Sequence, residues 1–377
     1  MRDTSDMKLY SLFSIVLIGI ICSCNGKESP AMIVDETRKT YFLDDMVKDY
    51  SLLTLKDDSV DGLVGRINKV LIDDDLIFLS HFPNEQSGDL QQQLGVYDLK
   101  GNYLHGIGHT GRAFNEYQAV RDWSIDIINK EVLVYDPFRN RIQKYSYDGS
   151  FKSSITLNNE ILRANQLYCN NSRIYIQSMI PNESSDDITR ILDDGTKVPL
   201  MPKRKLSTED FYIDGVNQLS NPGNDTLYHI RPLDNNLYKI IDQDCSKMQT
   251  LDFILIPSAK KMKKFTTDDY DYLIAMPPYC YDTKSYFFVQ TIKDGLYVFS
   301  KNEIKWTHYI EKDQINATII IPNSIVGVSE DKIIGQITTM RARDELRYNQ
   351  NLTENEKVVF EQILKSENPT LVFYNLK

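Results

Sequence analysis

Residues 132–151 read VLVYDPFRNRIQKYSYDGSF, and this stretch contains the unit from which the fold can be predicted. Val132–Tyr135 is a short apolar run, and Ile142–Tyr145 is a second run in which apolar and polar residues alternate. Asp148 and Gly149 follow as a turn signal, because glycine tolerates the positive φ angles of tight hairpin turns. Runs rich in valine, isoleucine and tyrosine between such turns are typical of β-strands. The stretch therefore predicts neighbouring strands joined by hairpins.

The same unit recurs along the chain at a nearly constant interval. The turn glycines Gly101, Gly149 and Gly195 are 48 and 46 residues apart. A repeat of this length with about four strands is typical of one blade of a β-propeller, whereas a two-sheet sandwich would repeat less regularly. Six such units fit into residues 46–377. We therefore predict an all-β fold, a six-bladed β-propeller.

A radial fold has to close, and one region interrupts its strand pattern. For closure, the last blade is expected to borrow a strand from the N-terminal part, near Ser51–Leu55 or Ile67–Ile72. The interruption is Arg341–Glu367, where a capping sequence and a one-sided apolar stripe predict a helix over Glu354–Lys365. The prediction is thus a propeller with a short helical insertion near its C-terminus.

The composition is that of an ordinary globular protein. The chain has 377 residues, of which 41% are hydrophobic and 25% charged. Its net charge is −10, whereas a general nucleic-acid-binding protein would show a basic surplus. We therefore expect no nucleic-acid partner.

The N-terminus has the layout of a signal peptide. Leu9–Ile21 is an apolar run preceded by Lys8, and it is shorter than the roughly 20 residues that span a bilayer. The tetrapeptide Ile-Cys-Ser-Cys that ends at Cys24 resembles a bacterial lipobox. The resemblance implies cleavage before Cys24 and attachment of diacylglycerol to its thiol. The alternative is an ordinary secretory signal cleaved nearby.

These features divide the chain into three parts. Residues 1–23 are expected to be a lipoprotein signal peptide, residues 24–45 a lipid-anchored tether, and residues 46–377 the propeller. A start at Met7 would remove two acidic residues that are unusual in a signal peptide, and this alternative stays open.

Three motifs, in order along the chain, resemble a known family. IGHTGRAFNEY at Ile107–Tyr117 resembles IGxxGxGPGEY, NDTLY at Asn224–Tyr228 resembles NDTVY, and Glu367–Lys377 resembles an NPVLxLYKLK ending. These segments mark six-bladed β-propeller lipoproteins of Gram-negative gut bacteria, whose blades resemble NHL repeats. The resemblance implies a lipid-anchored protein of the Gram-negative envelope, at the outer membrane, in either leaflet. The family carries no generally established activity. Ala113–Asn115 replaces its Gly-Pro-Gly, so any binding role of that backbone is altered here.

The candidate binding residues belong to two loops that follow strands of successive blades: Arg112, Glu116, Tyr117, Arg139 and Arg141. Arg121, Asp122 and Trp123 lie beside the first loop. Arginine suits carboxylates through its planar guanidinium, and aromatic rings suit sugars through stacking. The negative net charge favours a neutral or mildly acidic ligand. The alternative is that these residues only stabilise the turns.

No motif for a catalytic or metal site is present. The sequence lacks HExxH, GxSxG and a P-loop, and its three cysteines after the signal, Cys169, Cys245 and Cys280, are expected to be buried apolar residues. The acidic run Asp73–Asp75 lacks the spacing of a calcium loop and is expected in a solvated turn. Ser59, within Asp-Ser-Val, is a candidate for O-glycosylation because the tripeptide resembles the one that related bacteria modify.

Three functions are compatible with this reading, of which the third is a purely structural component of the envelope. The first is a lipid-anchored envelope propeller that acts as a binding or scaffold module for a glycan, a peptide or a partner protein, without a cofactor. The second is a calcium-dependent hydrolase, similar to a lactonase or esterase, with its site in the central channel. Carboxylates and asparagines converging from three or more blades would favour the hydrolase. An apolar channel beside an aromatic-rich face would favour binding.

Overall fold

A computed structural model describes residues 45–56, 62–83, 91–157, 164–178, 188–201, 217–231, 236–250, 279–291, 295–309, 325–350 and 352–377. The predicted signal peptide, almost all of the predicted tether, Cys24 and Ser59 lie outside these residues. The described part is an all-β fold with two short helices near the C-terminus.

The strands of the first half form antiparallel meanders. The first meander comprises β2 (Arg66–Asp73), β3 (Leu76–Phe82), β4 (Gln93–Asp98) and β5 (Tyr103–Gly106). The second comprises β6 (Asp122–Asp126), β7 (Glu131–Asp136), β8 (Arg141–Ser146) and β9 (Phe151–Thr156). The third comprises β10 (Ala164–Asn170), β11 (Arg173–Ser178), β12 (Ile188–Ile191) and β13 (Lys197–Pro199).

The second half continues the pattern with one change. β14 (Asn217–Ser220) pairs in parallel with β18, apart from the antiparallel group of β15 (Leu227–Arg231), β16 (Asn236–Ile241) and β17 (Asp244–Thr250). The next meander comprises β18 (Tyr279–Asp282), β19 (Tyr286–Thr291), β20 (Gly295–Ser300) and β21 (Lys305–Tyr309). The last comprises β22 (Ile325–Ser329), β23 (Lys332–Ile337), β24 (Thr370–Leu376) and β1 (Val47–Thr54).

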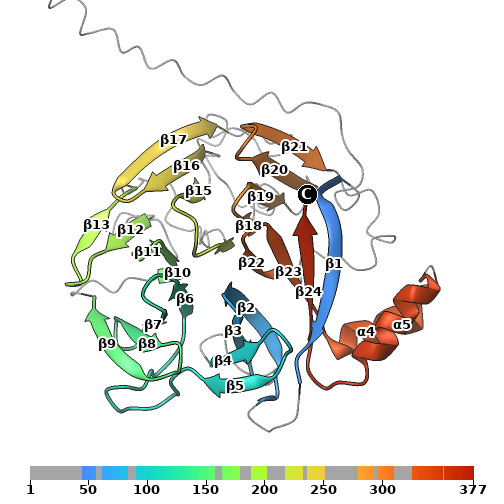
Figure 1. Cartoon of the computed structure of the whole chain (residues 1–377). Coiled ribbons are helices and arrows are strands. Elements are labelled where there is room, and N and C mark those ends of the chain that lie inside the picture. Colours follow the sequence, from blue (N-terminus) through green and yellow to red (C-terminus); the bar gives the residue numbers. More distant parts are fainter. Residues whose placement is uncertain are drawn as a thin grey trace, which may run out of the picture.

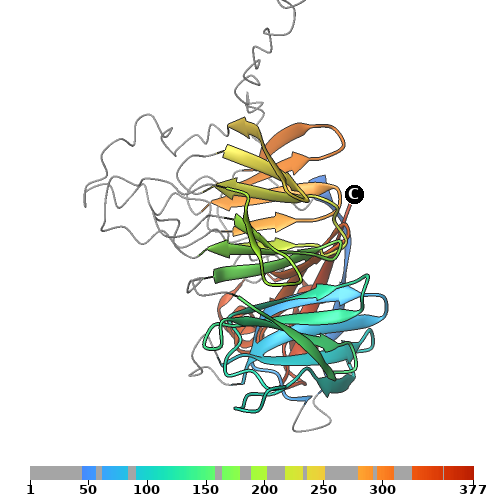
Figure 2. The same ribbon diagram turned by 90° about the vertical axis from the view of Figure 1, so that its left-hand side faces the viewer.

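The sheets are arranged around a common centre, as Figure 1 shows. The first strands of the groups, such as β2, β6, β10, β18 and β22, lie nearest to this centre. Parallel pairing joins β2 to β22, so two meanders merge into one eight-stranded sheet. In the side view of Figure 2 the strands run from one face of the body to the other. This is a propeller-like arrangement.

The N-terminal and C-terminal strands pair directly. β1 is antiparallel to β24, with Ser51 opposite Phe373, and β24 pairs on its other side with β23. The expectation that the last blade borrows a strand near Ser51–Leu55 is confirmed. The alternative at Ile67–Ile72 is wrong, because those residues belong to β2 and lie near the centre.

The turn glycines also serve packing between neighbouring sheets. Gly101 and Gly149 have φ angles of 79° and 85°, as their hairpin turns require. A Cβ atom on Gly101 would lie 2.4 Å from the carbonyl oxygen of Thr54, at the end of β1. One on Gly149 would lie 2.6 Å from the carbonyl oxygen of Gly106, at the end of β5. The regular spacing of these glycines therefore reflects the close approach of each turn to the outer strand of the preceding meander.

The core lies between adjacent sheets. One cluster joins Leu133 and Tyr135 of β7 to Leu167 and Cys169 of β10. Cys169 and Cys280 are buried and Cys245 is half-buried, and these three form no disulfide in the part of the chain described here. The apolar role expected for them thus holds for Cys169 and Cys280.

Two helices, α4 (Thr339–Tyr348) and α5 (Glu354–Ile363), lie between β23 and β24 and project from the edge of the ring (Figure 1). α5 matches the predicted helix, and a capping box between Thr353 and Glu356 starts it. The sequence did not predict α4, which begins after Thr338. Neither helix, nor any other helical stretch that the structure describes, is long and apolar enough to cross a membrane.

Candidate functional site

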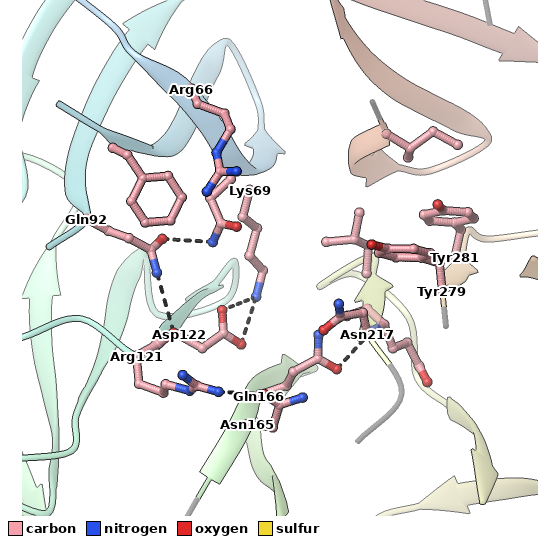
Figure 3. A pocket seen from close by; sticks show the side chains of 15 residues that line it. Arg66, Lys69, Gln92, Arg121, Asp122, Asn165, Gln166, Asn217, Tyr279 and Tyr281 are labelled. Carbon is pink, nitrogen blue, oxygen red and sulfur yellow. Dashed lines mark hydrogen bonds and ion pairs between the residues drawn. The ribbon is translucent and has the colours of Figure 1, made fainter. Parts of the chain in front are cut away.

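A cavity of about 420 Å³ lies at the centre, where the innermost strands begin (Figure 3). Its lining comes from the first residues of β2, β6, β10, β14, β18 and β22 and from the β3–β4 connection. Pockets for small molecules commonly measure about 300–1,000 Å³. The cavity therefore has the size of a small-molecule site, and most of its lining side chains are polar. We call it the central pocket.

A buried ion pair forms one wall of the central pocket. The Lys69 ammonium group lies 3.0 Å and 3.2 Å from the two carboxylate oxygens of Asp122 and donates a third hydrogen bond, 2.6 Å long, to the Trp123 carbonyl oxygen. Both side chains are more than nine-tenths buried. Asp122 Oδ2 also accepts a hydrogen bond from the backbone N–H of Leu167 at 2.6 Å. The pair thus joins β2, β6 and β10.

Amide side chains continue this wall. Asn68 donates to Gln92 Oε1 at 2.8 Å, and Gln92 Nε2 lies 3.4 Å from the Val120 carbonyl oxygen. Arg121 donates through Nη2 to Asn165 Oδ1 at 2.9 Å. These bonds fix the orientation of the side chains around the pocket before any ligand arrives.

A second set of amides links β10 to β14. Gln166 Oε1 accepts from the Gln218 backbone at 2.9 Å, while Gln166 Nε2 donates to the Gln218 carbonyl oxygen at 3.2 Å. The Gln218 side chain donates to the Tyr228 carbonyl oxygen, but its buried Oε1 atom has no hydrogen-bond partner within the described ranges. An unpaired buried polar atom costs free energy. Gln218 is therefore a polar group of the pocket lining whose acceptor is unused.

The pocket lining includes an exposed arginine and two tyrosines. The Arg66 guanidinium lies over the Phe82 ring, 4.7 Å from its centroid, and has no carboxylate partner among the residues the structure describes. Tyr279 and Tyr281 lie across the pocket from Lys69, as Figure 3 shows. Burial raises the pKa of Tyr281, so its hydroxyl stays protonated at neutral pH.

The two loop arginines predicted to bind a ligand, Arg139 and Arg141, donate hydrogen bonds to the neighbouring loop. Arg139 donates to the carbonyl oxygens of Ala113 at 2.6 Å and Glu116 at 2.9 Å. Arg141 donates to those of Phe114 at 2.7 Å and Glu116 at 3.0 Å. These contacts fit the alternative of turn stabilisation, and ligand binding by the two arginines stays a prediction.

The other loop residues have different surroundings. Arg112 is exposed. Tyr117 is buried, and burial raises the pKa of its phenol. The Glu116 carboxylate accepts from the Ala113 backbone N–H and from His109 Nε2, both at 2.7 Å. These two bonds, that from Ala113 first, hold the pKa of Glu116 below its ordinary value. Binding by these residues also stays a prediction.

The donor set of the central pocket does not resemble a calcium site. Calcium takes six to eight oxygen ligands, usually with several carboxylates. The described lining contains one carboxylate, Asp122, which is already paired with Lys69, and it also contains Arg66 and Arg121. In the described ranges no three His, Cys, Asp or Glu side chains gather where they could hold a metal.

The lining matches neither of the two patterns expected from the sequence. Asn68, Asn165 and Asn217 converge from three inner strands, as a hydrolase would require, but the carboxylates expected with them are replaced by cations. The channel is also not filled by apolar side chains. The pocket is instead a polar, cation-rich cavity.

The sequence contained one signal for this pocket. Lys69 stands within the apolar run Ile67–Ile72, where a charged residue would be buried. A buried lysine needs a partner. Nothing in the local sequence identified Asp122 as that partner.

Comparisons with known structures support the fold. A Bacteroides fragilis protein described as exported shares 15% identity with the chain, at a TM-score of 0.62. The alignment covers 87% of this chain and 95% of that one. A DUF4221 family member from Bacteroides vulgatus shares 13% identity, at a TM-score of 0.52, over 88% of this chain and 98% of that one. At such identities the likeness concerns the fold alone.

Comparison of sequences identifies the family. No curated protein matches the chain. A family model described as a domain of unknown function, DUF4934, matches residues 33–375, which is nearly the whole chain. The match includes the strands that line the central pocket and nearly all of the β1–β24 pair. The chain therefore belongs to the DUF4934 family.

Proposed function

We propose that the chain is a six-bladed propeller that binds a small ligand, or the end of a larger one, in its central pocket. The proposed blades are β2–β5, β6–β9, β10–β13, β18–β21, the group of β22, β23, β24 and β1, and a blade formed by β15–β17 with β14, which pairs in parallel with β18. Each contributes its first strand to the pocket lining. Pairing of β1 with β24 completes the last blade.

The proposed location is the bacterial envelope. The signal-like run before Cys24 supports export and lipid attachment, and a structural relative of this fold is described as exported. Residues 24–45 would then connect the lipid to the propeller. In this arrangement the pocket would be accessible to ligands outside the cytoplasm.

One observation carries the binding proposal: five strands from distant parts of the sequence, β2, β6, β10, β14 and β18, bring polar side chains to one preformed cavity. Hydrogen bonds between Asn68, Gln92, Arg121 and Asn165 hold this lining in place. Such preorganisation reduces the entropy that a site loses on binding. No observation favours the hydrolase, because Asp122 is committed to Lys69 and to the β10 backbone.

The test is to fill the pocket. Asn217 is exposed at the start of β14 and lines the cavity, so Asn217→Trp places an indole inside it without breaking a hydrogen bond of that side chain. The full chain with Cys24→Ala, for solubility, is screened on glycan and peptide arrays and compared with the same chain carrying Asn217→Trp. Glu361→Trp, on the exposed face of α5, is the control.

The expected result is loss of array binding in the Asn217 variant alone, with an unchanged melting temperature in both variants. Binding that survives Asn217→Trp would move the site away from the pocket. The site would then have to lie elsewhere, for example at the loops that contain Arg112 and Arg139.

A further inference from the structure

We infer that the central pocket binds a hydroxylated carboxylic acid of the uronic acid type. The inference rests on the proposed function, since it names the ligand class of that same pocket. It follows from three properties of the lining: its charge balance, the presentation of Arg66, and the groups opposite the cations.

The charge balance favours an anion. Among the residues that the structure describes, the lining contains three cationic side chains, Arg66, Lys69 and Arg121, and one carboxylate, Asp122. Asp122 neutralises Lys69, and Arg66 has no carboxylate partner among the residues that the structure describes. This positive site lies in a chain of net charge −10, so the local charge is opposite to that of the whole protein. In a partly enclosed polar cavity, charge of one sign concentrates ligands of the other.

Arg66 presents a guanidinium in a defined plane. Its contact with the Phe82 ring, 4.7 Å from the centroid, restrains one face of the group, and the residue remains exposed at the pocket. The edge of a planar guanidinium matches a carboxylate through two parallel hydrogen bonds. A phosphate would fit the same fork. The carboxylate is preferred because Lys69, the point charge that would add to phosphate binding, is already engaged with Asp122.

The opposite side offers hydrogen bonds to hydroxyl groups. The Asn217 amide and the Tyr279 hydroxyl line the pocket and make no hydrogen bond to another residue that the structure describes. An amide both donates and accepts, and a phenol does the same, as recognition of sugar hydroxyls requires. The unused acceptor of Gln218 adds to this set, since it is a buried polar atom without a partner. A ligand with both a carboxylate and hydroxyl groups would satisfy both sides.

The experiment measures binding of three probes by calorimetry to the full chain carrying Cys24→Ala. The probes are D-glucuronate, the neutral D-glucose, and N-acetyl-alanyl-alanine, whose carboxylate comes from a peptide end. Arg66→Gln removes the charged guanidinium and leaves a shorter, neutral side chain that can still form hydrogen bonds. Arg343→Gln on α4 is the matched control, because that arginine is exposed and distant from the pocket.

We expect glucuronate to bind, and glucose and the peptide to bind at least tenfold more weakly. Arg66→Gln should weaken glucuronate binding roughly ten- to a hundredfold, with an unchanged melting temperature, while Arg343→Gln has no effect. Equal affinity for glucose and glucuronate would overturn the carboxylate assignment. Tighter binding of the peptide would overturn the sugar-acid assignment, and absence of glucuronate binding would overturn both. The proposal that the pocket is the binding site is tested separately, because array binding that survives Asn217→Trp would contradict it.

Discussion

Lys69 ties three sheets together through one buried ammonium group. It bonds to Asp122 and to the Trp123 carbonyl oxygen, and Asp122 bonds in turn to Leu167. Removal of one partner leaves a buried charge without compensation, which typically costs about 3–5 kcal/mol. We therefore predict that Lys69→Met lowers the free energy of unfolding by about 3–5 kcal/mol in urea denaturation.

The double variant Lys69→Met with Asp122→Asn is the control. It removes both charges and keeps an oxygen to accept the Leu167 bond. It should lose less stability than the sum of the two single variants. Strictly additive losses would show that the pair is not coupled.

The hydrogen bonds of Glu116 predict how the loop that contains Ala113 and Glu116 responds to pH. Its pKa is lowered by the bonds from Ala113 and His109, so its stabilisation of the loop is complete above the unfolded pKa of about 4.3 and is lost as pH falls through the lower folded value. We expect the amide-exchange protection factor of Ala113 to persist through about pH 4.3 and to decrease only below it.

In Glu116→Gln the same protection should be weaker and nearly independent of pH. A decrease in wild-type protection that begins above the ordinary glutamate pKa would contradict the assigned bonds. Protection factors, rather than raw exchange rates, are compared because exchange itself depends on pH.

At the scale of elements, loss of β24 is expected to destabilise the sheet more than loss of its own contacts alone. It lies between β1 and β23, so its removal exposes the edges of both. Open strand edges promote aggregation. Deletion of residues 369–377 should therefore lower both the melting temperature and the solubility, while Asn368, which bonds to Val64 and Gly62, is kept.

Complementation provides the control for this deletion. A synthetic peptide of residues 369–377, added during refolding, should restore solubility by occupying the gap between β1 and β23. A peptide of the same composition in scrambled order should not. A truncated protein with unchanged melting temperature and solubility would show that the β24 pairing is dispensable.

At the scale of the whole molecule, the proposed anchor decides where the protein resides. Cys24→Ala should move the protein from the detergent phase to the aqueous phase in a phase-partition experiment, because lipid attachment supplies the membrane affinity. Cys22→Ala is the matched control, since it changes the neighbouring cysteine of the same tetrapeptide. Retention of Cys24→Ala in the detergent phase would disprove lipidation at this residue.

The sequence predicted those features of the fold that are determined by residues close together in the chain. Val132–Tyr135 lies in β7 and Ile142–Tyr145 in β8, because strand alternation and turn glycines are local signals. α4 was not predicted because its sequence, TMRARDELRY, is mostly polar and it buries only Ala342 and Glu345. The central pocket could not be predicted from the sequence for another reason. Lys69 and its partner on β6 are 53 positions apart, and only the radial arrangement brings them together.

The pairing of β1 with β24 also determines an order of events while the chain is being made. The hydroxyl groups of Thr54 and Thr370 lie 3.1 Å apart, although 316 positions separate these residues. At about 5–20 residues per second, synthesis of that interval takes on the order of tens of seconds. During this time β1 has no partner. It carries Lys48 and Asp49 on its exposed part, and charges on a lone strand discourage pairing with other chains. These charges thus protect β1, the first strand of the described residues to be synthesised, until β24 is available for pairing.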